Sequence, residues 1–255
     1  MYYSFFIGPA GSGKSSLVEC VSKWLDDHNI DVTTVNLDPG VLTLPYGADV
    51  DVRNYVDIEK IILDYNLGPN GALIAATDIV AAKIHDIQKE IQDLGNEIVL
   101  VDTPGQMELF TYRSSGPFIV EAFGRKNCMV FFLVDPTLAK NPSDFVSILL
   151  LSLSTQFRFN TPQINLLTKI DLISESELER ILKWASEPYS LLESLTEETS
   201  SIYRELAIQL YYSLENIGLL SELHPVSIKD VTGIEKIYGQ ISRIFLGGED
   251  SYIRQ

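Results

Sequence analysis

The chain has 255 residues, of which 45% are hydrophobic and 21% charged, and its formal net charge at pH 7 is −16. This length and apolar share are typical of one large globular domain or of one domain with an insertion, and no apolar run reaches the roughly 20 residues that a membrane-spanning helix needs. The acidity argues against direct binding to nucleic acid, and two cysteines with no basic signal-peptide start favour a cytoplasmic protein.

The predicted elements alternate between strand and helix along the chain. Short apolar or β-branched runs predict strands at 2–8, 32–37, 97–105, 128–135, 164–171 and 224–228. Helical spacing predicts helices at 16–29, 57–67, 72–95, 144–157, 174–186 and 233–246. A strand followed by a helix, repeated in this way, predicts an α/β fold: a doubly wound, mostly parallel sheet with helices on both faces.

Residues 187–222 depart from this alternation because they contain helical patterns but no strand pattern. We therefore expect one domain over residues 1–255 with a helical insertion at about 187–222. The stretch 174–222 carries ten Glu against three Lys or Arg. This surplus fits a solvated helical surface or, alternatively, a face that docks a partner.

The strongest motif follows the first predicted strand and precedes the first predicted helix. Residues 8–15 read Gly-Pro-Ala-Gly-Ser-Gly-Lys-Ser, which fits G-x-x-x-x-G-K-[ST]. Such a loop turns its backbone N–H groups toward a phosphate, with the positive end of the helix behind them. Lys14 would reach the outer phosphates, and the Ser15 hydroxyl would ligate Mg²⁺. The motif predicts a nucleoside triphosphate site formed by Gly11, Ser12, Gly13, Lys14, Ser15 and Ser16.

Two further motifs stand at predicted strand ends, where ligands of parallel sheets bind. Asp102-Thr103-Pro104-Gly105-Gln106 offers a carboxylate for the magnesium shell and the Gly105 N–H for the γ-phosphate. Thr168-Lys169-Ile170-Asp171 resembles the N-K-x-D element of GTPases, in which the Asp accepts two hydrogen bonds from guanine; its first residue here is Thr instead of Asn. Ser227 stands in a segment that resembles the element backing the base.

These motifs together resemble the GPN-loop GTPase family. The P-loop, a strand ending in Asn-Leu-Asp-Pro, the segment Gly68-Pro69-Asn70, Asp-Thr-Pro-Gly-Gln-x-Glu and Thr-Lys-x-Asp follow one another in order over almost the whole chain. Gly68-Pro69-Asn70 would by itself be an ordinary turn between helices. The resemblance implies a Mg²⁺-dependent GTPase that works as a homodimer, in which this segment of one protomer reaches the nucleotide of the other.

The resemblance also assigns roles to individual residues. It places Gln106 and Glu108 beside the attacking water, Asp38 and Asp102 near magnesium and that water, and Asn70 on phosphate. The expected catalytic residues are Asp38, Asn70, Asp102, Gln106 and Glu108. The expected magnesium residues are Ser15, Asp38 and Asp102. The remaining nucleotide contacts are expected from Gly68, Pro69, Gly105, Thr168, Lys169, Ile170, Asp171 and Ser227.

The motifs leave one alternative open and argue against another. The same site could serve a nucleotide-gated scaffold or chaperone for a protein client, with an RNA-polymerase-assembly-like role, in which hydrolysis only resets binding. A nucleotide or small-molecule kinase would share the P-loop, but it would have no need for Asp102–Gln106 and Asp171 at these spacings. We therefore expect binding of GTP and GDP with Mg²⁺, and a possible protein client.

Overall fold

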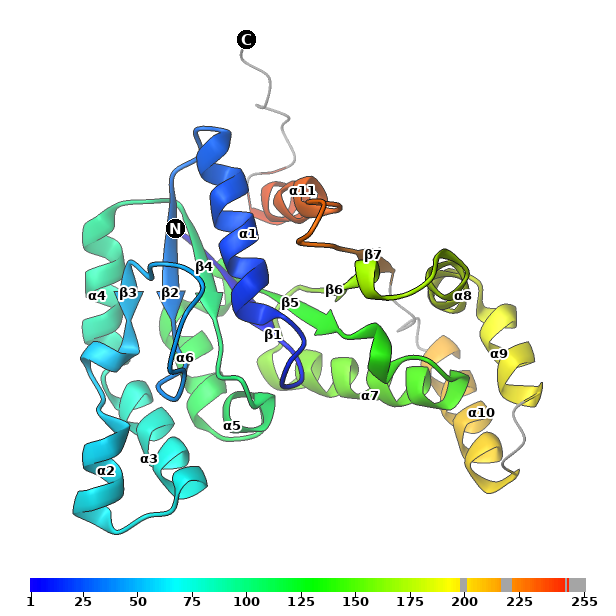
Figure 1. Ribbon diagram of the computed structural model, residues 1–255, viewed down its shortest axis with the longest axis horizontal. Helices are drawn as coiled ribbons and strands as arrows, with labels where there is room; N and C mark the ends of the chain where they lie inside the picture. The colour runs from blue at the N-terminus through cyan, green and yellow to red at the C-terminus, as the bar shows by residue number, and fades with distance from the viewer. Residues whose placement is uncertain (198–200, 217–221, 246, 248–255) are drawn as a thin grey trace.

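The computed structural model describes residues 1–197, 201–216, 222–245 and 247 (Figure 1). Within them lies one sheet of seven strands in the order β3-β2-β4-β1-β5-β6-β7, and every neighbouring pair is parallel. The strands are β1 (Tyr2–Ile7), β2 (Val32–Asn36), β3 (Val50–Asp51), β4 (Ile98–Asp102), β5 (Cys128–Val134), β6 (Gln163–Leu167) and β7 (Leu223–Pro225). The α/β, doubly wound fold of P-loop NTPases is therefore confirmed.

Helices cover both faces of the sheet because side chains alternate along each strand. Phe6 of β1 and Leu100 of β4 point to the face packed by α1 (Lys14–Asp27) and α11 (Ile234–Phe245). Phe5 and Val101 point to the opposite face, which is covered mainly by four helices. These are α3 (Pro69–Ala82), α4 (Ile84–Leu94), α6 (Ser115–Phe123) and α7 (Pro142–Phe159). Figure 1 shows the two helical layers on either side of the strands.

The single helix predicted at 72–95 is wrong, because the structure has two helices there. α3 begins earlier, at Pro69, and the break falls at Lys83, whose backbone has φ −97° and ψ 9°. Buried residues spaced by three or four continue across the break, from Val80 in α3 to Ile84 in α4. The spacing of the apolar residues therefore resembles that of one continuous helix. At the break, the Lys83 side chain donates to the Tyr55 carbonyl (2.9 Å).

Among the described strands and α-helices, three have no counterpart in the sequence prediction: β3, α5 (Met107–Thr111) and α6. The two-residue strand β3 is too short for an alternating pattern. α5 is little more than one helical turn, and it follows directly after the phosphate-side motif. The predicted helix at 57–67 is present as α2 (Ile58–Tyr65), and Asp57 caps its N-terminus as expected, because the Asp57 side chain accepts from the Lys60 N–H.

Between β6 and β7 the chain forms α8 (Glu175–Ser186), α9 (Pro188–Glu197) and α10 (Ser201–Asn216). Buried side chains such as Leu191, Leu195 and Tyr211 extend the core of the α7 face. Parts of the predicted insertion, 198–200 and 217–221, lie outside the described residues. Among the helices of the described ranges, none combines the length and the apolarity that a membrane span needs.

Candidate nucleotide-binding site

The P-loop lies at the centre of the carboxyl edge of the sheet, because β1 stands between β4 and β5. Its backbone requires glycine at two positions: Gly11 has φ +78° and Gly13 has φ +93°. A Cβ on Gly8 would lie only 2.7 Å from the Leu133 carbonyl oxygen of β5. The sequence motif therefore marks a backbone shape that other residues would strain, with α1 beginning at Lys14 directly behind it.

Lys14 is buried and connects the P-loop to the loop after β4. Its Nζ donates to the carbonyls of Gly8 (2.9 Å), Pro9 (3.1 Å) and Gly105 (3.0 Å). Burial lowers the pKa of Lys14, and the carboxylates of Asp102, Asp38 and Glu108 oppose that shift. Three predicted site carboxylates thus surround this one ammonium group.

Asp102, at the end of β4, has a carboxylate oxygen that could face a metal ion. The residue is 1% exposed, and burial raises its pKa to about 6, against the nearby Ser15 hydroxyl and Lys14. The Tyr46 hydroxyl donates to Oδ2 (3.2 Å), whereas Oδ1 is buried and has no hydrogen-bond partner among the described residues. A buried carboxylate oxygen without a donor is costly unless a cation or its water shell meets it.

Ser15 and Asp102 therefore fit the way P-loop proteins hold magnesium. Mg²⁺ there takes one or two protein oxygens together with waters and substrate phosphates. Consistent with so few protein ligands, the described residues contain no group of three or more His, Cys, Asp or Glu arranged to hold a metal ion. Asp38 fits less well, because both of its carboxylate oxygens already accept backbone N–H groups.

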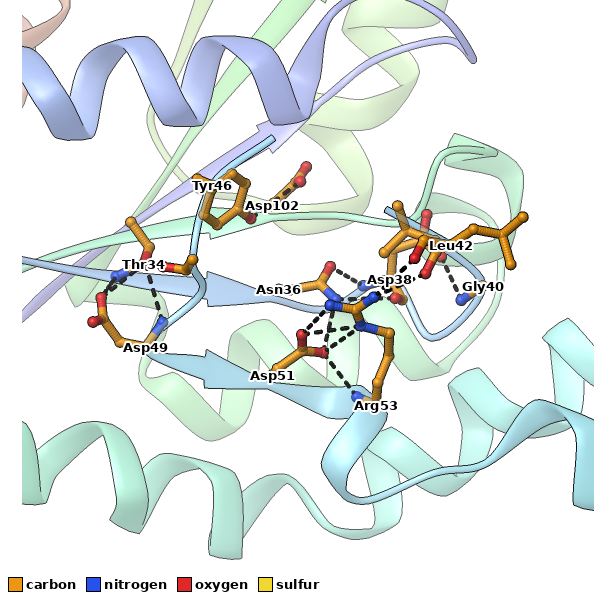
Figure 2. A network of polar contacts seen from close by, with 12 residues as sticks. Thr34, Asn36, Asp38, Gly40, Leu42, Tyr46, Asp49, Asp51, Arg53 and Asp102 are labelled. Atoms are coloured by element: carbon orange, nitrogen blue, oxygen red, sulfur yellow. Dashed lines mark hydrogen bonds and ion pairs between the residues drawn. The ribbon is translucent and has the colours of Figure 1, made fainter. Parts of the chain in front are cut away.

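Asp38 follows β2 and reaches across to the loop after β4 (Figure 2). Its Oδ2 accepts from the Gly105 N–H and its Oδ1 from the Gly40 N–H, both at 2.8 Å. The fully buried Asn36 clamps the Asp38 backbone: its Oδ1 accepts from the Asp38 N–H (2.9 Å), and its Nδ2 donates to the Asp38 carbonyl (3.1 Å). Asp38, which is predicted to lie near the reacting water, therefore accepts a hydrogen bond from the Gly105 N–H, which is predicted to contact the γ-phosphate.

Further polar contacts fix the orientation of the Asn36 side chain. The Nδ2 of Asn36 also donates to Asp51 Oδ1 (3.0 Å), and Arg53 forms an ion pair with Asp51 at 2.6 Å. Arg53 further donates to the carbonyls of Val41 and Leu42, in the loop between β2 and β3. Figure 2 shows these side chains as one network around the two strand ends. Leu42 itself is 95% exposed at the tip of that loop.

The predicted water-positioning residues stand at the start of α5. Gln106 precedes its first turn, Glu108 lies within that turn, and both side chains are exposed. The loop before them is anchored by Thr103, whose hydroxyl donates to the Phe6 carbonyl of β1 (2.6 Å). Within the described residues, the Gln106 side chain makes no hydrogen bond. Gln106 directly follows Gly105, whose carbonyl accepts from Lys14, so it stands on the phosphate side of the P-loop.

The residues predicted to contact the base meet on the other side of the P-loop. The Thr168 hydroxyl donates to the Ser12 carbonyl (2.9 Å), so Thr in place of Asn still ties this element to the P-loop. Ser227 donates to Asp171 Oδ1 (3.1 Å) and thereby orients the exposed Asp171 carboxylate. A cavity of about 80 Å³ opens between these segments. Its lining comprises Ser12, Gly13, Ser16, Leu17, Thr168, Lys169, Val226 and Ile228.

Three polar residues of this site were not predicted from the sequence: Asn36, Tyr46 and Asp135. Asp135 ends β5 and forms an ion pair with Lys169 (2.8 Å). A signal for Asp135 was present, because Val-Asp-Pro at 134–136 repeats the Leu-Asp-Pro pattern that marks Asp38. Tyr46 stands in a loop with no motif of its own, so only the folded chain brings its hydroxyl to Asp102.

The segment Gly68-Pro69-Asn70 is the start of a helix and not a free turn. Gly68 is the N-cap of α3, with φ −73° and ψ 167°, and Pro69 occupies the first helical position. The left-handed residue that reverses the chain is Asn66, with φ 50°, at the end of α2. Gly68, Pro69 and Asn70 are all exposed, and the described contacts include none from the Asn70 side chain to the P-loop. Figure 1 places the α2–α3 connection at the periphery of the molecule.

The fold and this P-loop define the class: the chain is a P-loop nucleoside triphosphatase. A family model described as "Conserved hypothetical ATP binding protein" matches residues 6–246. The chain is 31% identical to GPN-loop GTPase 3 of Dictyostelium discoideum over 96% of this chain and 87% of that protein. It is 38% identical to GPN-loop GTPase PAB0955 of Pyrococcus abyssi over 70% and 71% of the two chains.

The solved structures agree with these relatives. The crystal structure titled as PAB0955, a GTPase in apo form from Pyrococcus abyssi, matches with a TM-score of 0.86 at 31% identity, over 96% of this chain and 97% of that one. The chain therefore belongs to the GPN-loop GTPase family and is a GTP-binding GTP hydrolase. The family model's description names ATP, but a carboxylate such as Asp171 matches the N1–H and 2-amino donors of guanine, a pair that adenine lacks.

Proposed function

We propose that this GTPase hydrolyses GTP to GDP and phosphate with Mg²⁺, as a homodimer in which Gly68-Pro69-Asn70 of each protomer contacts the nucleotide of the other. The observation that carries the proposal is the position of that segment. It begins α3 in full exposure, with no described contact to the P-loop of its own chain. A neighbouring copy is the simplest way for a nucleotide to meet it.

Gly68 supports this interpretation because no steric contact among the described residues requires a glycine at this N-cap. Its φ of −73° suits any residue, and a Cβ added there would meet no atom within 4 Å among the described residues. A glycine that neither its own backbone conformation nor its packing requires fits a position that another backbone approaches closely. Pro69 fixes the entry to the helix, and the amide of Asn70 then stands at the positive end of α3, where an anion is favoured.

Different residues of one protomer bind the metal, the phosphates, the water and the base. Ser15 and the free Oδ1 of Asp102 would hold magnesium, which when bound neutralises charge on the phosphates. Lys14 binds the outer phosphates, and the Gly105 N–H donates to the γ-phosphate after exchanging its present acceptor, Asp38. Gln106 and Glu108 orient the attacking water, and Asp171 selects guanine. Phosphoryl transfer depends mainly on such positioning and charge neutralisation.

Hydrolysis of GTP by wild type and Asn70→Ala, over a range of protein concentrations and with ATP as control, tests this proposal. We expect Asn70→Ala to lose about tenfold or more in turnover, a typical cost for one lost hydrogen-bond donor to transition-state charge, while GTP binding stays unchanged. Asn127→Ala is the matched control, since Asn127 is also exposed but precedes β5 at the opposite edge of the sheet. Wild-type turnover by Asn70→Ala would show that the segment does not act on the nucleotide.

One observation also favours the scaffold alternative. Leu42 is almost fully exposed on a loop that contacts Asp38 through the Gly40 N–H and Asp102 through the Tyr46 hydroxyl. An exposed leucine so close to the nucleotide-sensing residues suits a protein contact that depends on nucleotide state. A client that bound equally well to the GDP and GTP-analogue forms would contradict this second candidate.

A further inference from the structure

We propose that Asp135 is a positioning residue for guanine nucleotides: its carboxylate holds the Lys169 side chain across the P-loop, where the lysine stem forms one wall of the base pocket. This inference rests on the base pocket proposed above. It concerns a residue outside the recognised motifs, and it follows from how three strand ends meet.

Hydrogen bonds to both oxygens hold the Asp135 carboxylate in its orientation. The residue is only 7% exposed, at the end of β5. Its Oδ1 accepts from the Thr137 N–H (2.8 Å) and the Thr137 hydroxyl (2.7 Å), which closes a short turn. Its Oδ2 accepts from Lys169 Nζ (2.8 Å). Since one oxygen is fixed by the turn, the other is aimed at Lys169, and these hydrogen bonds hold the pKa of Asp135 below its ordinary value despite burial.

Lys169 is held at both its backbone and its ammonium group. Its backbone is left-handed, with φ 54° and ψ 34°, a conformation that costs energy for a residue with a side chain. Its Nζ also donates to the Gly11 carbonyl of the P-loop. The side chain therefore runs over the loop: Lys169 Cε lies 3.8 Å from where a Cβ on Gly13 would stand. Lys169 is accordingly among the residues that line the cavity.

The sheet explains why an aspartate at this position can do this. β5 is hydrogen-bonded to β1 on one side and to β6 on the other. Val134 pairs with Leu167, so Asp135 leaves the sheet beside Thr168 and Lys169. A long lysine side chain has several rotamers, and ordering it costs conformational entropy. The carboxylate removes that freedom before the base arrives, which improves binding by preorganisation.

A double-mutant cycle on GDP binding tests the proposal. Asp135→Asn keeps the shape and removes the charge, and Lys169→Met keeps the stem and removes the ammonium group. We expect Asp135→Asn to weaken GDP binding about tenfold, the scale of a lost charge-assisted hydrogen bond. The double variant should bind no more weakly than Lys169→Met alone. Additive losses would overturn the proposal, because independent residues add.

A base-free ligand separates positioning from a general structural role. Binding of inorganic tripolyphosphate should be the same in wild type and Asp135→Asn, whereas equal losses for tripolyphosphate and GDP would overturn the base-pocket role. Asp144→Asn is the matched control: Asp144 is exposed at the start of α7, accepts from Asn141 (2.8 Å), and should leave GDP binding unchanged. If Asp135→Asn does not fold, Asp135→Glu replaces it; wild-type GDP affinity in that variant would contradict the proposal, because the longer side chain displaces the ammonium group.

Failure of this inference differs from failure of the proposed function. If wild type bound ADP as tightly as GDP, the guanine pocket itself would be wrong. If wild type preferred GDP and the cycle were additive, only the role of Asp135 would be wrong.

Discussion

The two sides of the P-loop are built differently. On the base side, comprising Asp135, Thr168, Lys169, Asp171 and Ser227, polar side chains bond to one another or to the P-loop within the chain. The phosphate side comprises Asp38, Asp102, Gly105, Gln106 and Glu108. Here the Gly105 N–H donates to Asp38, but the side chains of Gln106 and Glu108 at the start of α5 are exposed. The comparison fits the proposed homodimer, in which one chain supplies the guanine-binding side chains and the partner adds a group to the phosphate side.

This difference makes affinity and turnover separable by mutation. Changes on the base side should lower affinity for GDP, as expected for Asp135→Asn. Changes on the phosphate side should lower turnover and leave GDP affinity nearly unchanged. Three substitutions, at Asp102 and at two residues that contact Asp38, test the separation, beginning with the largest expected effect.

Asp102→Asn should have the largest effect, a loss of about 100-fold in GTP turnover, the scale on which groups around a catalytic metal act. The measurement is phosphate release at saturating GTP across a series of Mg²⁺ concentrations. We expect the Mg²⁺ requirement to rise as well, because the amide replaces one of the two oxygens of the carboxylate. An unchanged Mg²⁺ requirement would remove Asp102 from the magnesium site.

The same substitution should stabilise the metal-free protein. The native pKa of Asp102 is about 6, raised by burial from its ordinary value of 3.8, so the native state favours the neutral carboxyl. This favourable contribution to the free energy of unfolding is fully present below about pH 4 and is lost as the pH rises through 6. Urea unfolding in EDTA at pH 7.5 should therefore show Asp102→Asn more stable by up to about 3 kcal/mol, with the gain shrinking toward pH 4. Asp144→Asn should show no such gain.

Asn36→Asp should reduce turnover about tenfold while GDP affinity stays within twofold. The new carboxylate would face Asp51 and would lose both donations of the amide, to Asp51 and to the Asp38 carbonyl. Asn96→Asp is the control at the other end of β2, where Asn96 donates to the Val32 carbonyl (3.1 Å) and the Thr33 hydroxyl (3.2 Å). Equal effects of the two substitutions would mean that β2 matters only as a strand and that Asn36 does not position Asp38.

Gly40→Ala should have the smallest effect, a roughly threefold loss of turnover. An added Cβ would lie 2.3 Å from Leu73 Cδ2 of α3 and 3.3 Å from Asp38 Oδ1, so the leucine must move and the carboxylate is crowded. Gly47→Ala, in the same loop, meets no atom within 4 Å and should behave as wild type. A loss confined to Gly40→Ala would show that turnover depends on the close packing of Gly40 against Leu73 and Asp38.

The sequence predicted the parts of the site whose chemistry depends on residue type at fixed spacing. The P-loop was accessible because Gly11 and Gly13 need positive φ and Lys14 must follow them. The strands other than β3 were accessible because they fall in short apolar or β-branched runs. Asn36 and Tyr46 were not accessible, since their roles depend on partners 15 and 56 residues away along the chain, Asp51 and Asp102.

The start of α3 shows another limit of sequence reasoning. Gly, Pro and Asn are usual turn residues, but Gly at the N-cap and Pro at the first position also begin helices. Local composition cannot decide between these interpretations, and the deciding residue was Asn66, whose left-handed backbone ends α2. The break at Lys83 was equally hidden, because the apolar spacing on its two sides is continuous.

The position of β1 in the middle of the sheet also governs when the molecule can fold. Tyr2–Ile7 is made well before its two neighbours, which are formed by residues 98–102 and 128–134. A chain emerging from the ribosome therefore carries an unpaired, strongly apolar strand until those segments have been synthesised. Ser227 emerges later still, so the base pocket is completed last. Pairing of such distant segments is slow, so the exposed apolar strand makes the partly synthesised chain prone to aggregation.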